Sequence, residues 1–328
     1  MLIGSSPDPL LILLLALVID LAFGDMPLVF RYLPHPVALV GQAISVLDRR
    51  LNRATRSDAA RRVRGVFVAL VLIAAAAALG WVVTKYVAVV RFGWALEAVI
   101  VAVLLAQRSL FEHVAAVAKG LQAGGLVAGR EAVAKIVGRD PESLDEHGVA
   151  RAAIESLFEN FSDGVVAPAF WYVLLGLPGI FAYKTANTLD SMIGHRSPKY
   201  LHFGWAAARF DDALNWIPAR LTGLLVALAA LALHDTKAGA ALRIMFRDAR
   251  KHRSPNAGWP EAAAAGALGL ALGGPRRYSG AVRDEPWLGD GRARATVADL
   301  GAALQLYLAA AAALAVLLLL AAAARRYL

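Results

Sequence analysis

Long apolar runs alternate with polar, basic stretches along this chain. The clear apolar runs lie near residues 9–23, 65–83, 94–110 and 302–324. The last of them exceeds the ~20 apolar residues that a helix needs to cross the hydrocarbon core of a bilayer. Lipid admits only helices and closed barrels, and these runs lack the two-residue alternation of barrel strands. The pattern therefore predicts an all-α, polytopic integral membrane protein.

Two further apolar stretches, 165–182 and 217–233, are either interrupted or only just long enough to cross. The first contains Pro168, Pro178 and several glycines. Broken apolar segments occur in membranes where protein covers the exposed backbone. We expect both stretches to be re-entrant, which leaves four crossings and places both termini outside. The alternative is that 217–233 is an ordinary span, because it holds fewer helix breakers.

Three long polar regions, 111–163, 183–220 and 234–301, connect the apolar runs. Arginine is concentrated earlier in the chain, where eight arginines lie within residues 31–64. The positive-inside rule therefore predicts that this loop is cytoplasmic. We expect the three polar regions to carry the chemistry of a single membrane-embedded catalytic domain that spans residues 1–328.

The composition supports a membrane protein and narrows its chemistry. Hydrophobic residues make up 59% of the chain and its mean hydropathy is +0.56, values that do not suit a soluble protein. Cysteine is absent, which excludes disulfides, thiolate metal sites and a cysteine nucleophile. The formal net charge is +9. No nucleic-acid-binding motif accompanies it, so the charge fits basic loops that face anionic lipid or phosphorylated substrates.

The region 183–220 concentrates polar residues between two apolar stretches. We expect residues 205–217 to form one helix that ends at Pro218, since proline lacks the N–H that a helix needs. Helical spacing places one polar set on one face of it, namely Arg209, Asp211, Asp212 and Asn215. The opposite face is apolar and should be buried, and it comprises Phe210, Ala213, Leu214 and Ile217.

The polar face of this helix offers groups that bind Mg²⁺ and phosphate. Carboxylates ligate Mg²⁺, and guanidinium groups bind phosphate oxygens. The alternative is a salt-bridged interfacial helix in which Arg209 pairs with Asp212 three residues on. The same region also holds Lys184, Asn187, Asp190 and His195.

A second candidate region lies at residues 143–163. Ser143 and Glu146 have the spacing of a capping box that opens a helix. An apolar face should follow at helical spacing, made by Ile154, Leu157, Phe158 and Phe161. A charged row repeats every four residues on another face, made by Arg151, Glu155 and Glu159. The row is either a solvated salt-bridge ladder or a source of metal ligands.

A basic turn is predicted near the centre of residues 248–261, where a Ser-Pro-Asn-x-Gly context favours a turn. The side chains that it presents are Lys251, His252, Arg253, Ser254 and Asn256. The two cations are suited to a phosphorylated substrate. The alternative is a basic turn that rests on lipid headgroups.

Several common signatures are missing from the chain. It has no G-x-x-x-x-G-K-[ST] phosphate loop, no zinc-type spacing among its histidines and no G-x-S-x-G nucleophile elbow. The residues alone therefore indicate a membrane enzyme or transporter that handles an anionic, phosphorylated substrate with Mg²⁺. They do not identify the reaction.

Five ordered blocks carry a resemblance to a known family. They are HPVALVG (35–41), ESLFENFSDGVVAPAFWY (155–172), KTANTLDSMIGH (184–195), YLHFGWAAARFDDALNWIPAR (200–220) and HRSPNAGWPEAAAAGALGLALGG (252–274). Together they resemble the adenosylcobinamide-phosphate synthase family of cobalamin biosynthesis, the CobD/CbiB type. The resemblance runs from His35 to about Gly289.

The resemblance implies a multi-pass ligase of the inner membrane whose active site faces the cytoplasm. Such a ligase joins the free propionate of adenosylcobyric acid to (R)-1-amino-2-propanol O-phosphate, or a similar amino-alcohol phosphate, and converts ATP to ADP. The implied ligands are a corrinoid, the amino-alcohol phosphate, ATP and Mg²⁺, with a lipid bilayer and no nucleic acid. Association with other cobalamin-pathway enzymes or with a second copy of the chain stays open.

The implied mechanism assigns roles to the candidate residues. Mg²⁺ would be held by Asp190, Asp211 and Asp212, together with Glu155, Glu159 or Asp163. Phosphate oxygens would be bound by Lys184, Arg209, Arg220, Lys251 and Arg253, with Asn187, Asn215, Ser254 and Asn256 as further substrate contacts. His252 or His195 would accept the proton of the amine, and Lys184 joins them as a catalytic candidate.

Two alternatives of other classes stay open. A transporter of an anionic or corrinoid substrate would use 165–182 and 217–233 as its pathway. A membrane transferase would use the acidic residues and Mg²⁺ on a lipid diphosphate. An internal repeat would favour the transporter, and the sequence shows no convincing repeat.

Overall fold

A computed structural model describes residues 7–26, 30–138, 140–278, 281–283 and 285–326 of the chain. The chain divides into two compact units. Unit 1 comprises residues 1–106, 167–215 and 321–328, and unit 2 comprises residues 107–166 and 216–320. Helices make up nearly all of the regular structure in both units, so the predicted all-α class is confirmed.

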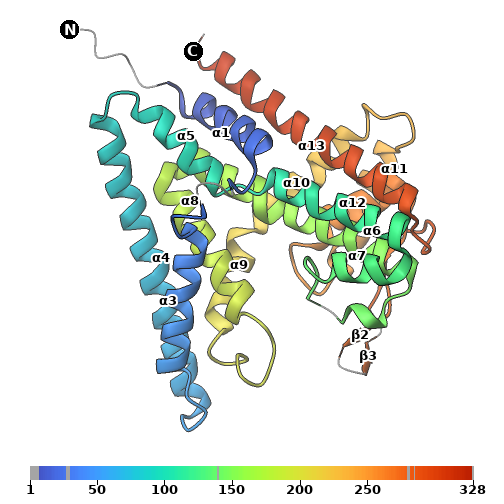
Figure 1. Cartoon of the computed structure of the whole chain (residues 1–328), viewed down its shortest axis with the longest axis horizontal. Coiled ribbons are helices and arrows are strands. Elements are labelled where there is room, and N and C mark those ends of the chain that lie inside the picture. Colours follow the sequence, from blue (N-terminus) through green and yellow to red (C-terminus); the bar gives the residue numbers. More distant parts are fainter. Residues whose placement is uncertain (1–6, 27–29, 139, 279–280, 284, 327–328) are drawn as a thin grey trace. The chain divides into compact units, whose positions relative to one another are not determined.

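Unit 1 is a helical bundle (Figure 1). Its helices are α1 (Pro9–Phe23), α3 (Pro36–Leu51), α4 (Asp58–Val89), α5 (Gly93–Val103), α8 (Ala167–Ile193) and α9 (Trp205–Leu214). α4 packs along α8 and also contacts α3, α5 and α9. A buried apolar cluster at this junction includes Ile44, Val68, Leu189 and Phe203. The cluster fixes the segment that leads from α8 into α9.

Two glycines let α4 approach its neighbours closely. A Cβ at Gly65 would lie 1.8 Å from the carbonyl oxygen of Phe203, and a Cβ at Gly80 would lie 2.7 Å from the backbone of Leu177 and Pro178. No side chain fits at those distances, so a larger residue at either position would push α4 away. Small residues at such contacts are typical of packed membrane helices.

A group of side-chain hydrogen bonds holds the loop between α8 and α9 against α3. Asp48 is 7% exposed, and its carboxylate accepts hydrogen bonds from Lys199 Nζ at 2.8 Å and from the Tyr200 hydroxyl at 3.2 Å. Arg61 of α4 donates to the backbone carbonyl of Lys199 and to Asn52 Oδ1, the latter at 2.9 Å. The loop that precedes α9 is therefore tied to two helices.

Unit 2 contains α6 (Gln107–Val133), α7 (Glu146–Phe161), α10 (Trp216–Ala229), α11 (Ala238–Asp248), α12 (Gly258–Leu268) and most of α13 (Val297–Ala324). Three single turns complete its helical part, namely η1 (Pro141–Ser143), η2 (Ser162–Val166) and η3 (Ala249–Lys251). The alanine-rich α12 is buried and packs against α7, α10 and α11. Tyr307 ties α13 to α6, because its hydroxyl donates to the Gln107 carbonyl at 2.6 Å.

Unit 2 also holds two short antiparallel ladders that the sequence did not predict. β1 (Leu272–Gly273) pairs with β4 (Trp287–Leu288), and β2 (Arg276–Tyr278) pairs with β3 (Ala281–Arg283). Gly289 has a positive φ of 93° directly after β4, which allows the chain to turn there. β1 lies against α7.

α7, η2 and α8 follow one another without a loop. α7 begins after its N-cap Asp145, whose carboxylate accepts the Gly148 N–H at 2.7 Å. The predicted capping box is therefore wrong, because the nearer aspartate takes the cap position and the Ser143 hydroxyl donates to the Asp140 carbonyl. The predicted apolar face of α7 is confirmed, since all four of its residues are buried.

The helix breakers within 165–182 bend a helix and do not end it. Pro168 lies in the first turn of α8, where its missing N–H costs little. Gly176 has φ 63° and ψ −149° inside α8, two residues before Pro178. The proline removes one helical hydrogen bond, and the glycine adopts the positive φ that the kink requires.

In the part of the chain that the structure describes, four helical stretches are long and apolar enough to cross a membrane, namely Asp58–Val89, Gly93–Val133, Glu146–Ile193 and Val297–Ala324. Three of them contain the predicted crossings 65–83, 94–110 and 302–324. Glu146–Ile193 contains 165–182, for which a re-entrant path stays a prediction. α1 and α10 have 15 and 14 residues, about 22 and 21 Å at 1.5 Å per residue, against ~30 Å of hydrocarbon. The chain is thus a polytopic, all-α membrane protein.

Candidate functional site

The structure divides the predicted site residues between the two units. Unit 1 holds Lys184, Asn187, Asp190, His195, Arg209, Asp211, Asp212 and Asn215. Unit 2 holds Glu155, Glu159, Asp163, Arg220, Lys251, His252, Arg253, Ser254 and Asn256. Each unit brings part of its own set together.

Asp211 lies at the centre of the unit 1 set. Asp211 is only 9% exposed, and its Oδ1 accepts a hydrogen bond from Asn187 Nδ2 of α8 at 3.2 Å. Burial and then the negative charge of Asp190 raise the pKa of Asp211 to about 7, although hydrogen bonds with Asn187 and Asn215 oppose the rise. Two carboxylates and two amides therefore meet where α8 packs on α9.

This acid cluster fits Mg²⁺ that arrives with a phosphorylated ligand. A buried carboxylate beside a second carboxylate is costly unless a proton or a cation neutralises the charge. Within the described ranges, no group of three or more His, Asp and Glu side chains is placed to hold a metal ion. Mg²⁺ needs few protein ligands, because it keeps several waters and is usually bound through one or two carboxylates plus substrate phosphates. Asp190 and Asp211 meet that smaller requirement.

The predicted orientation of α9 is partly wrong. Asp211 and Asn215 are buried, whereas Ala213 is exposed and Ile217 is 46% exposed. The prediction placed the apolar side inward, which is the arrangement of a helix on the surface of a soluble protein. In a membrane protein the apolar side is free to face lipid, so the polar side turns toward internal partners.

α9 also ends earlier than predicted. It stops at Leu214, Asn215 is its C-cap, and α10 begins at Trp216. Pro218 lies in the first turn of α10, where a proline has no helical hydrogen bond to lose. Asn215 is held at this junction because its Oδ1 accepts the Tyr183 hydroxyl at 2.9 Å.

The remaining polar residues of this region lie nearer the surface. Arg209 Nη1 and Asp212 Oδ2 are 3.1 Å apart, so the alternative of an Arg209–Asp212 salt bridge is confirmed. Burial raises the pKa of Asp212 in spite of the opposing charges of Arg209 and Arg196. His195 is exposed just beyond the end of α8. Asp211 is therefore the buried acid of the motif, and Asp212 is an ion-pair partner.

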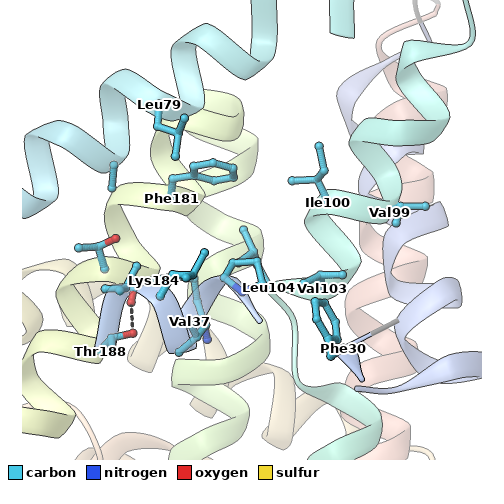
Figure 2. A pocket seen from close by; sticks show the side chains of 15 residues that line it. Phe30, Val37, Leu79, Val99, Ile100, Val103, Leu104, Phe181, Lys184 and Thr188 are labelled. Carbon is cyan, nitrogen blue, oxygen red and sulfur yellow. Dashed lines mark hydrogen bonds between the residues drawn. The ribbon is translucent and has the colours of Figure 1, made fainter. Parts of the chain in front are cut away.

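Lys184 lines an apolar cavity of about 310 Å³ in unit 1 (Figure 2). The walls come from α3, α4, α5 and α8, and they include Val37, Leu79, Ile100 and Phe181. Thr188 lies one turn after Lys184 and donates its hydroxyl to the Lys184 carbonyl at 2.6 Å.

His35 is the N-cap of α3, and its pKa responds to the charge of Lys184. Burial lowers the pKa of His35, the negative charge of Asp25 opposes that change, and the positive charge of Lys184 lowers the pKa further. The phosphate contact of Lys184 stays a prediction.

The three residues of the predicted charged row of α7, which belongs to unit 2, have different surroundings. Glu155 is 3% exposed, and its Oε1 accepts the N–H of Gly273 in β1 at 2.7 Å. Arg151 donates to a backbone carbonyl ahead of α13 at 2.6 Å. Glu159 is exposed, and Asp163 is half-buried in η2. Glu155 is a buried anchor for β1, so the alternative of a solvated ladder is wrong at that position.

Asp248 organises the basic turn that follows α11. Its buried carboxylate accepts hydrogen bonds from Arg247 at 2.8 and 2.7 Å and from the Gly289 N–H at 2.8 Å, and Lys251 Nζ lies 2.6 Å away. Arg247, and then Lys251 and the Gly289 amide, hold the pKa of Asp248 well below its usual range. Lys251 is therefore held in an ion pair. Arg253 is exposed, and across the described part of the chain no ion pair engages it.

His252, Ser254 and Asn256 build the turn itself. The Ser254 N–H donates to His252 Nδ1 at 3.0 Å, and Ser254 Oγ accepts the N–H groups of Asn256 and Ala257, each at 3.2 Å. His252 Nε2 faces Glu261 Oε1 at 3.8 Å, which is an ion-pair distance and not a hydrogen bond. A neutral ring that accepts at Nδ1 carries its proton on Nε2, so it has no lone pair left for another proton. In this geometry His252 positions the turn.

Arg220 makes cation–π contacts with two indole rings. Its guanidinium carbon lies 4.0 Å from the ring centre of Trp216 and 4.4 Å from that of Trp259. One of its N–H groups donates to the Trp216 carbonyl. A guanidinium held against aromatic rings still has N–H groups at its edge that bind an anion such as a carboxylate or phosphate.

Three buried polar residues near these groups were not predicted as parts of the site. Glu261 is 1% exposed and faces His252, Asp248 holds Lys251, and Tyr183 holds Asn215. Glu261 had a detectable signal, because it is a lone acid directly before a run of alanines. Asp248 had only its spacing of three residues from Lys251, and Tyr183 had none, since its partner Asn215 lies 32 residues away.

These features define a polytopic, all-α membrane protein with a buried acid beside a half-buried one in one unit and a structured basic turn in the other. The model of the CobD/Cbib protein family matches residues 13–307. The chain belongs to the CobD/Cbib family, and the resemblance that the sequence blocks indicated is confirmed.

Curated relatives support this assignment over most of the chain. The cobalamin biosynthesis protein CobD of a Sinorhizobium species is 55% identical over 308 residues, which cover 93% of this chain and 95% of the relative. The proteins of the same name from Brucella melitensis and Rhodobacter capsulatus are 52% and 49% identical, over 91% of this chain and 92% of each relative. No solved structure matches the chain.

Proposed function

We propose that this chain is the adenosylcobinamide-phosphate synthase of a cobalamin biosynthesis pathway. In the proposed reaction an amide bond joins the free propionate of adenosylcobyric acid to (R)-1-amino-2-propanol O-phosphate, or to a similar amino-alcohol phosphate. ATP is converted to ADP and phosphate in the same reaction. The observation that carries the proposal is the family match over residues 13–307, with relatives named cobalamin biosynthesis proteins.

The acid cluster of unit 1 supports a role in handling Mg-ATP. Asp190 and Asp211 would hold Mg²⁺, and Asn187 orients Asp211 through its hydrogen bond. Bound Mg²⁺ supplies charge neutralisation for phosphoryl transfer. Asp212 is the weaker metal candidate because it already pairs with Arg209. Glu155 is likewise engaged by β1, whereas Glu159 and Asp163 stay candidates.

The ligation is proposed to proceed in two balanced steps. A carboxylate oxygen of the corrinoid attacks the γ-phosphorus of ATP, the bond to ADP breaks, and an acyl phosphate forms. The amine nitrogen then attacks the acyl carbon, phosphate leaves, and the nitrogen gives up a proton. No step needs an oxidant or a reductant.

The described cations differ in their suitability for this chemistry. Arg253 is exposed and Arg220 presents the edge of a guanidinium held against aromatic rings, so both are suited to bind phosphate oxygens. Lys251 is less suited because Asp248 already holds it. His195 is the better candidate for proton acceptor, since both ring nitrogens of His252 face internal groups.

We also propose that the protein lies in the inner membrane with its polar regions 183–220 and 234–301 facing the cytoplasm. The concentration of arginine within residues 49–64 supports this orientation through the positive-inside rule. Cytoplasmic ATP is the second reason, because ligation consumes it. Association with other pathway enzymes would fit a membrane-bound ligase that receives a large corrinoid.

One assay tests the proposed reaction. The purified protein is incubated with adenosylcobyric acid, aminopropanol phosphate and Mg-ATP, and the mixture is analysed by mass spectrometry. We expect a product with the summed mass of the two substrates less one water, and ADP in equal amount. An Asp211→Asn variant, purified in the same way, controls for a contaminating ligase. A transporter would leave all three compounds unchanged, and that result would overturn the proposal.

A further inference from the structure

The first turns of α4 and the end of α3 carry arginines, most of which lack an acidic partner. Residues 49–64 contain seven arginines. Arg61 lies 3.8 Å from the carboxylate of Asp58 and also contacts Asn52 and the loop backbone at Lys199. Arg62 lies over the ring of Trp205 at 3.9 Å. Within the ranges that the structure describes, no ion pair engages the other five, which are Arg49, Arg50, Arg53, Arg56 and Arg64.

Three of these arginines lie close enough to repel one another. Arg56 donates to the Leu51 carbonyl at 2.7 Å, which fixes it at the corner between α3 and α4. Desolvation and then the charges of Arg64 and Arg53 lower the pKa of Arg56. The acid in the first turn of α4, Asp58, pairs with Arg61 and His202. Like charges held at one corner without an ion-pair partner of their own favour the binding of an anion.

An apolar groove lies beside these charges. It is lined by Leu51, Ala59, Ala60, Val63, Arg64 and Phe67. Val63, Phe67 and Leu70 follow at helical spacing along α4 and are 69%, 61% and 50% exposed. Arg64 is the last charged residue before an uncharged run that ends at Lys85. The groove therefore starts at the charged end of a candidate span and continues along a face that suits lipid tails.

We infer that this corner binds one anionic phospholipid of the bilayer. Its phosphate would lie among Arg53, Arg56 and Arg64, and an acyl chain would lie in the groove along Ala60 and Phe67. A soluble phosphate ester would satisfy the charges but leave the apolar groove uncovered. A zwitterionic lipid would fill the groove but leave a net positive charge. The two features together select an amphiphilic anion.

Native mass spectrometry on the delipidated full-length protein tests the inference, with phosphatidylglycerol and phosphatidylcholine as the two probes. Each basic residue near an anionic surface contributes roughly fivefold to affinity, so three should favour phosphatidylglycerol by about a hundredfold. The triple variant R53Q/R56Q/R64Q should lose that preference. Ala60→Phe fills the groove without changing charge and should weaken both lipids.

Arg91→Gln is the matched control, because Arg91 follows the other end of α4 and lies over Phe92 at 5.1 Å. It should leave the preference unchanged. Equal binding of phosphatidylglycerol by the wild type and the triple variant would overturn the inference, as would competition by inorganic phosphate at comparable concentration. If the triple variant fails to fold, photoreactive phosphatidylglycerol on the wild type decides the question. Cross-links within residues 51–67 support the site, and cross-links confined to other segments refute it.

Discussion

The two adjacent acids of α9 have opposite surroundings. Asp211 is buried beside Asn187 and Asp190, whereas Asp212 pairs with Arg209 at 3.1 Å and its side chain is 28% exposed. Successive side chains on a helix are about 100° apart, so one acid turns inward and the next turns sideways. The two acids should therefore differ in function, although they look alike in the sequence.

Asp211→Asn should abolish the proposed ligation, while Asp212→Asn should leave most of it. The first variant removes the buried charge that would hold Mg²⁺, and we expect kcat/KM to fall by about a hundredfold or more, the effect of losing one preorganised charge-stabilising group. The second variant breaks one exposed ion pair, worth about 0.2–1 kcal/mol of stability. Steady-state kinetics over a Mg²⁺ titration measures both. Equal losses would contradict the distinction between the two acids.

The two cations of the basic turn also differ in their surroundings, because Lys251 pairs with Asp248 and Arg253 is exposed. Arg253→Ala should raise the KM for a phosphorylated substrate by about ten- to a hundredfold, because a charge-assisted hydrogen bond is worth about 1.5–3 kcal/mol. Lys251→Ala should lower the melting temperature and change that KM little, since Lys251 is the partner of Asp248. Kinetics and melting curves on both variants check this. A KM effect in Lys251→Ala without loss of stability would reverse the assignment.

Asp248 should make the free energy of unfolding of unit 2 depend on pH in the acid range. Its folded-state pKa is depressed, so its ionised form stabilises the fold above the unfolded-state value of about 3.9. That contribution is lost as the pH falls below about 4 toward the folded-state pKa. Asp248→Asn should lower the free energy of unfolding by about 2 kcal/mol at pH 7. This is less than the loss expected for a fully buried ion pair, because Arg247 and Lys251 are partly exposed.

Melting curves of the wild type and Asp248→Asn at pH 7 and pH 3 measure this contribution. The difference between the two proteins should shrink at pH 3. Asp290→Asn is the control, because Asp290 pairs with the same Arg247 but is exposed, and its effect should be smaller. A gap between wild type and Asp248→Asn that stays constant with pH would rule out the ionised carboxylate as its cause.

At the scale of elements, the kink in α8 depends on a single glycine. Gly176 combines φ 63° with ψ −149°, a region of backbone space that is open almost only to glycine. A Cβ there would meet only Pro178 Cδ, at 3.9 Å. The cost of a substitution would therefore come from the backbone and not from a clash.

Gly176→Ala should destabilise the protein by about 1–3 kcal/mol, the cost of holding a non-glycine residue in such a region. Gly239→Ala is the matched control, because Gly239 lies within the helix α11 and a Cβ there would meet nothing within 4 Å. Alanine should be neutral or stabilising at that position by up to about 1 kcal/mol. Thermal unfolding of both variants gives the comparison. Equal stabilities would mean that α8 straightens without penalty.

The sequence predicted some elements well and others poorly, for identifiable reasons. The run 9–23 coincides with α1, and the last run lies within α13, because a predominantly apolar stretch leaves few other structures in lipid. The face of α9 was mispredicted because its polar side has internal partners. The two-residue ladder of β1 and β4 depends on pairing between distant residues, which local pattern does not encode.

The candidate site was predictable in its parts and not in its contacts. The sequence located both acids and both cations, and the local sign that separates Lys251 from Arg253 is Asp248, three residues before Lys251. The carboxylate of Asp248 also holds the amide of Gly289, 41 residues away. The pairing of Tyr183 with Asn215 joins residues 32 apart in the same way. Such contacts follow from the packing of helices and not from spacing along one of them.

At the scale of the whole molecule, the candidate chemistry is divided between the units. The acids of α8 and α9 belong to unit 1, and the basic turn belongs to unit 2. One boundary between the units falls between Asn215 and Trp216. The proposed ligation needs an acid set and a cation set, so variants in either unit should impair it.

The side of the membrane that each set faces is open to direct test. α10 has 14 residues, about 21 Å, which is too short to cross ~30 Å of hydrocarbon as a straight helix. We therefore expect Arg196→Cys and Pro255→Cys, both at exposed positions, to react with an impermeant maleimide from the same side. The cysteine-free parent gives the blank. Labelling from opposite sides would make residues 217–233 a full crossing and contradict the re-entrant prediction.

The close approach of α4 at Gly65 and Gly80 restricts how unit 1 is able to move. Backbone contact at two points 15 residues apart, about 22 Å along the helix, prevents α4 from sliding or rolling without first separating from its neighbours. The wall that α4 and α8 give to the 310 Å³ cavity is therefore fixed. A movement that admits a molecule to that cavity must therefore come from α3 or α5. Of these two helices, α5 is the shorter with 11 residues, and it follows Phe92, whose backbone is left-handed.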